Sequence, residues 1–136
     1  MEIIIGKKNI SFGWIWILFG IIMGAIMGLW SFNGPFPSPV GDYTSLPRRM
    51  LRLSHIAFIM LAIINILYGY EIDKLKIKEK LKKIGSNFMI YGAILMPFIL
   101  LSSVFIELFK YLTIIPAVFI ITSLLIIVFG KSQNSR

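Results

Sequence analysis

Four apolar runs, each long enough to cross a lipid bilayer, dominate this chain of 136 residues. At ~1.5 Å rise per residue, a helix of about 20 residues covers the ~30 Å hydrocarbon core of a membrane. A soluble domain of this size must present a largely polar surface, which a chain with 57% hydrophobic residues cannot do. The sequence therefore predicts an all-α membrane protein, an antiparallel bundle of four transmembrane helices in a single domain. These helices are expected at residues 12–30, 47–70, 87–108 and 111–130.

Basic residues are distributed unequally between the two ends of this bundle. Four spans put both termini and the linker at residues 71–85 on one side, which holds ten of the 14 lysines and arginines. The other four are Arg48, Arg49, Arg52 and Lys110. Because an excess of lysine and arginine marks cytoplasmic loops, we expect a multi-pass protein of the prokaryotic cell (inner) membrane with both termini in the cytoplasm.

The linker at residues 71–85 concentrates charge between two apolar runs. It contains six lysines and three acidic residues, Glu71, Asp73 and Glu79. Its apolar residues recur at helical spacing, so two interpretations are open: a short amphipathic helix on the lipid headgroups, or a solvated charged loop. Each lysine near an anionic surface contributes ~1 kcal/mol. We therefore expect anionic lipid, and not nucleic acid, to meet the net charge of +8.

The two connections on the opposite side are predicted to differ. Residues 31–44 contain three prolines, which fix φ and hold the preceding residues extended, so this segment is expected to cross the bundle as an ordered strap. Almost nothing separates the third run from the fourth. A tight hairpin around Lys110 would make these two helices antiparallel neighbours.

Two helix starts carry recognisable signals. Ser45, or the threonine before it, is placed to cap the second helix, with Pro47 in the first turn, where a missing N–H costs nothing. Gly85 interrupts the helical pattern of the lysine linker. The third helix is therefore expected to begin after this glycine, capped by Ser86 or Asn87.

Small or polar residues line one face of each expected helix when residues are placed about 100° apart. Glycines at this spacing usually allow a neighbouring helix to approach closely, while branched and aromatic side chains face lipid. We therefore predict that these faces form the interior of the bundle. They comprise Gly13, Gly20, Gly24 and Met27 on the first helix; Arg52, His55, Ala62, Asn65 and Gly69 on the second; Met89, Gly92, Met96, Ser103 and Glu107 on the third; and Pro116, Ser123 and Gly130 on the fourth.

The segment Ser45–His55 holds the only histidine and three of the four arginines. It starts the second helix on the outward side, and the third helix, running outward, is expected to bring Glu107 to the same level. Ionisable groups within a membrane are costly and usually have partners. We expect Glu107 to pair with Arg52 or Lys110 and to pin the helix ends.

A cofactor site at this segment is the alternative. In a b-type haem site, His55 would be one axial ligand, Met27 or Met23 the other, and Arg52 or Arg49 would take a propionate. In a quinone site, the quinone head would lie between His55, which hydrogen-bonds a carbonyl, and Glu107, which accepts the proton.

Other chemistries are limited by residue counts. One histidine and no cysteine cannot form a zinc site or a two-histidine haem site within one chain. The sequence contains no nucleophile-elbow, Walker or zinc-protease motif, so an enzyme complete in itself is not expected. A proton-coupled transporter would need a carboxylate near the membrane midplane, and none of the four runs has one there.

The run from Leu46 to Ala57, together with Asn65 and the pair Tyr68–Gly69, resembles a motif of small, uncharacterised bacterial membrane proteins. That motif has a Leu-Pro-Arg-Arg…Arg-Leu-x-His-Ile-Ala core, and the likeness covers about a fifth of the chain. The resemblance implies no known activity and assigns no catalytic role. It does imply that the segment Ser45–His55 is what such proteins share.

The sequence favours a small accessory or anchor subunit of a larger membrane complex, for example a respiratory or electron-transfer complex. Its polar mass is too small to house chemistry of its own. A haem b- or quinone-binding electron-transfer protein is the first alternative, and a small transporter is the second. Partner subunits in the membrane are expected in the favoured case.

Overall fold

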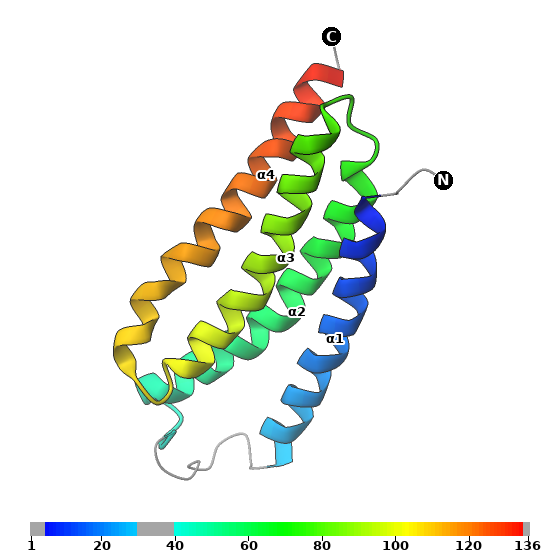
Figure 1. Cartoon of the computed structure of the whole chain (residues 1–136). Coiled ribbons are helices and arrows are strands. Elements are labelled where there is room, and N and C mark those ends of the chain that lie inside the picture. Colours follow the sequence, from blue (N-terminus) through cyan, green and yellow to red (C-terminus); the bar gives the residue numbers. More distant parts are fainter. Residues whose placement is uncertain (1–4, 30–39, 135–136) are drawn as a thin grey trace.

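The computed structural model describes residues 5–29 and 40–134 and shows a bundle of long helices (Figure 1). Four stretches of the described chain are helices long and apolar enough to cross a membrane. This confirms the prediction of an all-α bundle of four transmembrane helices. The elements are α1 (Gly6–Leu29), α2 (Leu46–Ile72), α3 (Glu79–Ser102), the short 3-10 helix η1 (Glu107–Thr113) and α4 (Ile114–Asn134).

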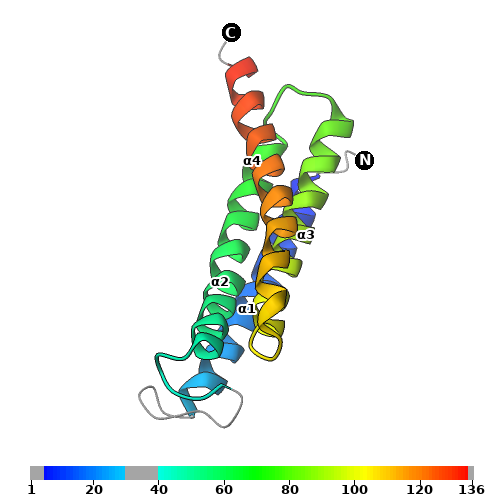
Figure 2. The same cartoon turned by 90° about the vertical axis from the view of Figure 1, so that its left-hand side faces the viewer.

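The helices α2 and α3 form the centre of the bundle. Helix α1 packs on α2 and helix α4 packs on α3, so the two outer helices lie on opposite sides of the central pair (Figures 1 and 2). The most apolar stretches of α1 and α4 are accordingly less buried than those of α2 and α3. The bundle is open, and much of its outer surface is made of large apolar side chains.

The bundle has two chemically different ends. The start of α1, the end of α4 and the loop between α2 and α3 lie together at one end, which we call the lysine end (Figure 1). The start of α2 and the 3-10 helix η1 lie at the other, which we call the arginine end. The segment Ser45–His55 belongs to the arginine end.

Helix α1 begins at Gly6, earlier than the predicted residue 12. The carboxylate of Asp73, just beyond the end of α2, accepts from the backbone N–H of Ile5 at 3.1 Å and of Gly6 at 3.0 Å. The first N–H groups of a helix have no partner within the helix. The Asp73 side chain, from a distant part of the chain, therefore allows α1 to begin within a polar segment that the sequence pattern placed before the helix.

Helix α3 begins at Glu79, so the prediction that Gly85 precedes it was wrong. Lys78 stands at the N-cap without a side-chain hydrogen bond. Gly85 lies inside the helix, where a methyl group placed on it would come within 2.2 Å of the Tyr68 hydroxyl and 3.0 Å of Ile126. The glycine serves close packing and does not interrupt the helix. Half of the lysine linker is consequently the first two turns of α3.

Helix α3 ends at Ser102 instead of residue 108. The Ser103 backbone N–H and hydroxyl both donate to the Ile99 carbonyl, at 2.9 and 2.8 Å, but the next two N–H groups, of Val104 and Phe105, bond only three residues back. Val104 is buried in the turn that follows. The predicted hairpin around Lys110 is replaced by this turn and by η1.

The start of α2 agrees with the sequence-based expectation. Ser45 is the N-cap residue, and its hydroxyl accepts from the backbone N–H of Arg48 at 3.3 Å while donating to the Val40 carbonyl at 2.6 Å. Pro47 lies in the first turn. The predicted proline strap falls largely on residues 30–39, which lie outside the described residues.

The glycine face of α1 packs on α2, as predicted. A methyl group on Gly13 would lie 2.7 Å from the Ala62 carbonyl, and one on Gly20 would lie 2.5 Å from the Ile59 side chain. The closest approach is at Gly6, where a methyl group would lie 1.9 Å from the Gly69 carbonyl. Any side chain at these positions would force α1 away from α2.

The predicted interior faces are largely buried. Arg52, His55, Met27 and Met96 are half-buried, and Glu107 is exposed because α3 ends before it. The buried members of these faces are Gly13, Gly20, Ala62, Asn65, Gly69, Met89, Gly92, Ser103, Pro116, Ser123 and Gly130.

Candidate functional site

His55 lies in the interface between α1 and α2. A methyl group placed on Gly24 would come within 2.7 Å of the Cε1 atom of His55 and 3.2 Å of its Nε2 atom. The imidazole therefore packs directly on the α1 backbone. Its Nδ1 atom is buried and has no hydrogen-bond partner within the described part of the chain. His55 thus combines close packing with one unused polar atom.

The arginines near His55 are held by aromatic contacts. The guanidinium of Arg52 lies 4.2 Å from the centre of the Tyr43 ring, and that of Arg48 lies 5.2 Å from it. Such cation–π contacts hold a guanidinium without an anion. Arg48 is buried and Arg49 is exposed. Within residues 5–29 and 40–134, no carboxylate forms an ion pair with Arg49 or Arg52.

Glu107 does not join this cluster. Its carboxylate pairs with the ammonium group of Lys110 at 2.5 Å, and its side chain is 65% exposed. Of the two partners expected from the sequence, Lys110 is therefore the one observed and Arg52 is not. Among residues 5–29 and 40–134, no hydrogen bond or ion pair joins Glu107 to His55, and the quinone site stays a prediction.

The residues do not fit a haem ligated by His55 and a methionine. An iron bound to Nε2 would have to occupy the space in which the Cε1–Nε2 edge rests on Gly24. Met23 and Met27 flank that glycine on α1, but they line a separate apolar cavity to which His55 does not contribute. Ligation would require α1 and α2 to separate.

This apolar cavity lies between α1, α2 and α3 and has a volume of about 440 Å³. Sequence inspection missed it, because its walls come from three helices. It runs over the α1 residues 16–27, about 16 Å at 1.5 Å per residue, toward the arginine end. Ten apolar side chains form its lining: Trp16, Phe19, Ile22, Met23, Ile26, Met27, Leu51, Phe58, Phe98 and Leu101.

Aromatic rings form the inner end of the cavity. The ring of Trp16 lies 5.2 Å from that of Phe58 and 6.0 Å from that of Phe98, and the two phenylalanine rings lie 5.6 Å apart. The Trp16 indole N–H donates to the Ala93 carbonyl at 3.0 Å. That carbonyl would otherwise lack a partner, because Pro97 has no N–H to offer it.

A buried polar cluster ties three helices together at the lysine end. The Asn9 amide nitrogen donates to the Asn65 side-chain oxygen at 3.0 Å and to the Ser86 carbonyl at 3.2 Å. The Ser86 hydroxyl donates to the Asn9 side-chain oxygen. The Asn65 amide also donates to the Leu61 carbonyl at 3.0 Å. The sequence indicated Asn65 as an interior residue but gave no reason to bury Asn9 or Ser86.

Two further serines tie neighbouring helices. The Ser54 hydroxyl of α2 donates to the Pro97 carbonyl of α3 at 2.8 Å, and the Ser123 hydroxyl of α4 donates to the Gly85 carbonyl of α3 at 2.9 Å. These two hydrogen bonds thus hold neighbouring helices together.

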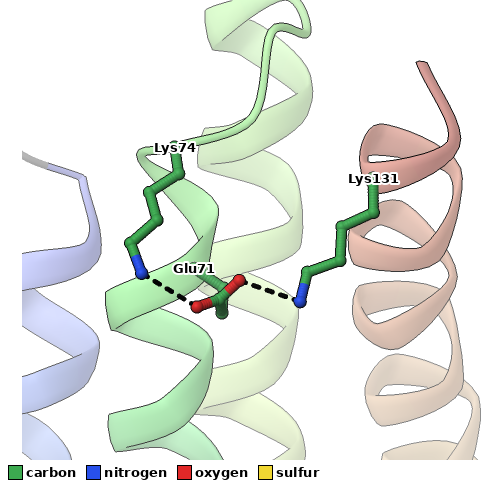
Figure 3. Close-up of polar contacts among 3 residues, drawn as sticks. All are labelled: Glu71, Lys74 and Lys131. Atoms are coloured by element: carbon green, nitrogen blue, oxygen red, sulfur yellow. Dashed lines mark hydrogen bonds and ion pairs between the residues drawn. The ribbon is translucent and has the colours of Figure 1, made fainter. Parts of the chain in front are cut away.

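Glu71 joins α2 to α4 at the lysine end. Its two carboxylate oxygens pair with the ammonium groups of Lys74 and Lys131, each at 2.9 Å (Figure 3). Among the described residues, no group of three histidine, aspartate or glutamate side chains could hold a metal ion.

The chain matches no protein-family model, no curated protein and no solved structure. The resemblance to small bacterial membrane proteins through the segment Ser45–His55 therefore stays a prediction.

Proposed function

We propose that this protein is a small accessory subunit that assembles with other helices of a larger membrane complex. The observation that carries the proposal is the apolar cavity between α1, α2 and α3. It lies within the apolar spans, and the described residues of its lining are aliphatic, aromatic and methionine side chains. Methionine adapts to irregular partners, and aromatic rings dominate the energetics of interfaces.

The occupant that fits the proposal is a set of side chains from a partner helix. A whole helix is about 10–12 Å across, so it would lie over the cavity and insert its large side chains. The polar side chains of the interior support this role, since Asn65, Ser54 and Ser123 form hydrogen bonds with neighbouring helices.

We propose that the lysine end faces the cytoplasm of a prokaryotic cell and that both termini lie there. The support is the ten-to-four distribution of basic residues between the two ends. A reporter fused after Arg136 should be active in the cytoplasm, and a periplasmic reporter would overturn this orientation. A respiratory or electron-transfer complex stays the expected setting.

Photo-crosslinking tests the accessory role directly. A photoreactive side chain at Met23, in the cavity, should give a protein adduct of fixed mass in intact membranes. The same group at Val128, which is 60% exposed on α4, should give mostly lipid adducts. Equal protein adducts at the two positions, or lipid adducts alone at Met23, would contradict a dedicated partner at the cavity.

A hydrophobic redox cofactor in the same cavity is the second candidate. It is favoured by one observation: the buried Nδ1 atom of His55, which has no hydrogen-bond partner among the described residues, belongs to the stretch of α2 between Leu51 and Phe58, two residues that line the cavity. Organic extraction of the purified protein should then yield a stoichiometric quinone that is lost in His55→Ala. A protein without quinone that retains its partner supports the accessory role instead.

A further inference from the structure

The lysines of the lysine end differ in the partners of their ammonium groups. Lys74 and Lys131 are paired with Glu71, and the Lys82 ammonium group donates to the Asp73 carbonyl at 3.0 Å. These lysines tie the helix ends to one another. Lys8 differs, because its ammonium group donates to the neutral side-chain oxygen of Asn87 and forms no ion pair with a carboxylate of residues 5–29 and 40–134. Within this part of the chain, the Lys8 charge therefore has no counter-charge.

Lys8 lies where α1 meets α3. The residue after it, Asn9, bonds Ser86 in the buried polar cluster, so Lys8 and Asn87 stand at the surface edge of the same helix contact. Lys83 lies one turn before Asn87 on α3, near enough for the Lys8 and Lys83 ammonium groups to repel each other. Two helices thus present cations toward one place.

The charges at this place do not cancel. Lys83 pairs with Glu79 at 2.6 Å, but both side chains are more than half exposed, and such pairs are weak. Lys80 is exposed on the same side of α3, seven residues before Asn87. Counting Lys8, Lys80 and Lys83 against Glu79 leaves a net charge of +2.

We propose that this α1–α3 edge, formed by Lys8, Lys80, Lys83 and Asn87, binds the phosphate of an anionic lipid headgroup. Three ammonium groups and one amide supply donors to phosphate oxygens from two helices. The site goes beyond the proposed accessory function and does not depend on it. It also locates the anionic-lipid contact at one edge, whereas the sequence suggested the whole lysine linker.

The surroundings favour a lipid over a free phosphate. Ile15 lies two turns beyond Lys8 on the same face of α1 and is 55% exposed. Tyr91 lies one turn beyond Asn87 on α3 and is 53% exposed. An apolar surface with an interfacial aromatic ring therefore continues directly from the cations into the membrane span, which matches the headgroup-to-chain order of a lipid.

Lipid titration followed by native mass spectrometry tests the site. Phosphatidylglycerol should bind the detergent-purified protein more tightly than phosphatidylcholine, and the double variant Lys8→Gln with Lys83→Gln should weaken it about thirtyfold, because each lysine near an anionic charge contributes about a factor of five. The control, Lys74→Gln with Lys131→Gln, removes the same charge from the same end and likewise leaves one glutamate unpaired. It should change binding by less than about threefold.

Equal losses in the two double variants, or equal retention of the two lipids, would overturn the site. Displacement of phosphatidylglycerol by millimolar inorganic phosphate would show that a free anion is the occupant and would also overturn it. If circular dichroism shows that the first double variant is unfolded, the single variant Lys80→Gln replaces it as the test. Its phosphatidylglycerol affinity should fall about fivefold. No loss in a folded Lys80→Gln variant would then contradict the proposal.

Discussion

The two ends of this bundle use polar residues in opposite ways. At the lysine end, polar groups far apart in sequence bond one another: Asp73 caps α1, Asn9 meets Asn65 and Ser86, and Glu71 joins α2 to α4. The arginine end has guanidiniums over the Tyr43 ring, an apolar cavity and a histidine nitrogen that has no hydrogen-bond partner among the residues described. We infer that stability is concentrated at the lysine end and that the arginine half is available for binding.

The largest expected effect is at the helix contact of the lysine end. In Gly6→Val, the new side chain would clash with the Gly69 carbonyl. This carbonyl belongs to the backbone of α2, so the clash cannot be relieved by the rotation of a side chain. We expect a loss of about 3 kcal/mol in the free energy of unfolding, measured in mixed micelles. Ser11→Val, at an exposed position of the same helix, is the control and should cost little. A tolerated valine at Gly6 would show that α1 is loosely held at this end.

The helix cap supplied by Asp73 should have the next largest effect. Asp73→Ala leaves the N–H groups of Ile5 and Gly6 without an acceptor, which should cost about 1–2 kcal/mol. Amide hydrogen exchange should quicken in the first turn of α1 and nowhere else. At the arginine end, Ser45→Ala should have a smaller effect, confined to the first turn of α2, because the Ser45 hydroxyl accepts from one backbone N–H whereas the Asp73 carboxylate accepts from two. Equal effects would remove the contrast between the ends.

A double-mutant cycle sharpens the account of the cavity. Trp16→Phe keeps an aromatic ring but removes the donor to the Ala93 carbonyl, for an expected cost of about 1 kcal/mol. Pro97→Ala restores a backbone N–H to that carbonyl, so the cost of Trp16→Phe should fall in its presence. Unfolding free energies of the four proteins give the coupling. A coupling of zero would mean that Trp16 stabilises by packing alone.

The smallest effect is expected for Glu107→Gln at the arginine end. Its pair with Lys110 is exposed and local in sequence, so the free energy of unfolding should not change measurably. Glu71→Gln, which disconnects α4 from α2, is the comparison and should increase hydrogen exchange at the end of α4. A larger effect at Glu107 would show that the arginine end is also held by its ion pair.

The sequence predicted well those features that depend on local chemistry or on helical periodicity. The four spans follow from apolar run length, the cap at Ser45 from its place before Pro47, and the packing of Gly13 and Gly20 from their spacing. In each case the relevant residues lie within a few turns of one another. Three further residues, Pro116, Ser123 and Gly130, faced the interior as the periodicity of α4 predicted.

The candidate site was predicted only in part. His55 and Arg52 are at the arginine end, but Glu107 pairs with Lys110 instead of Arg52, and it lies in η1 because α3 ends at Ser102. The cavity could not be predicted, since the sequence pattern around an aromatic residue such as Trp16 is the same whether its side chain faces lipid or a cavity.

By itself, then, the sequence determined the number of spans, the small-residue faces and the unequal charge of the two ends, because hydropathy and periodicity are properties of single segments. Only the tertiary structure decided where α1 and α3 begin, which carboxylates of the described chain pair with which lysines, and where the cavity lies. Each of these depends on a partner distant in the chain, as Asp73 is from Gly6. In lipid, where backbone groups find no water, such distant partners settle where a helix can start.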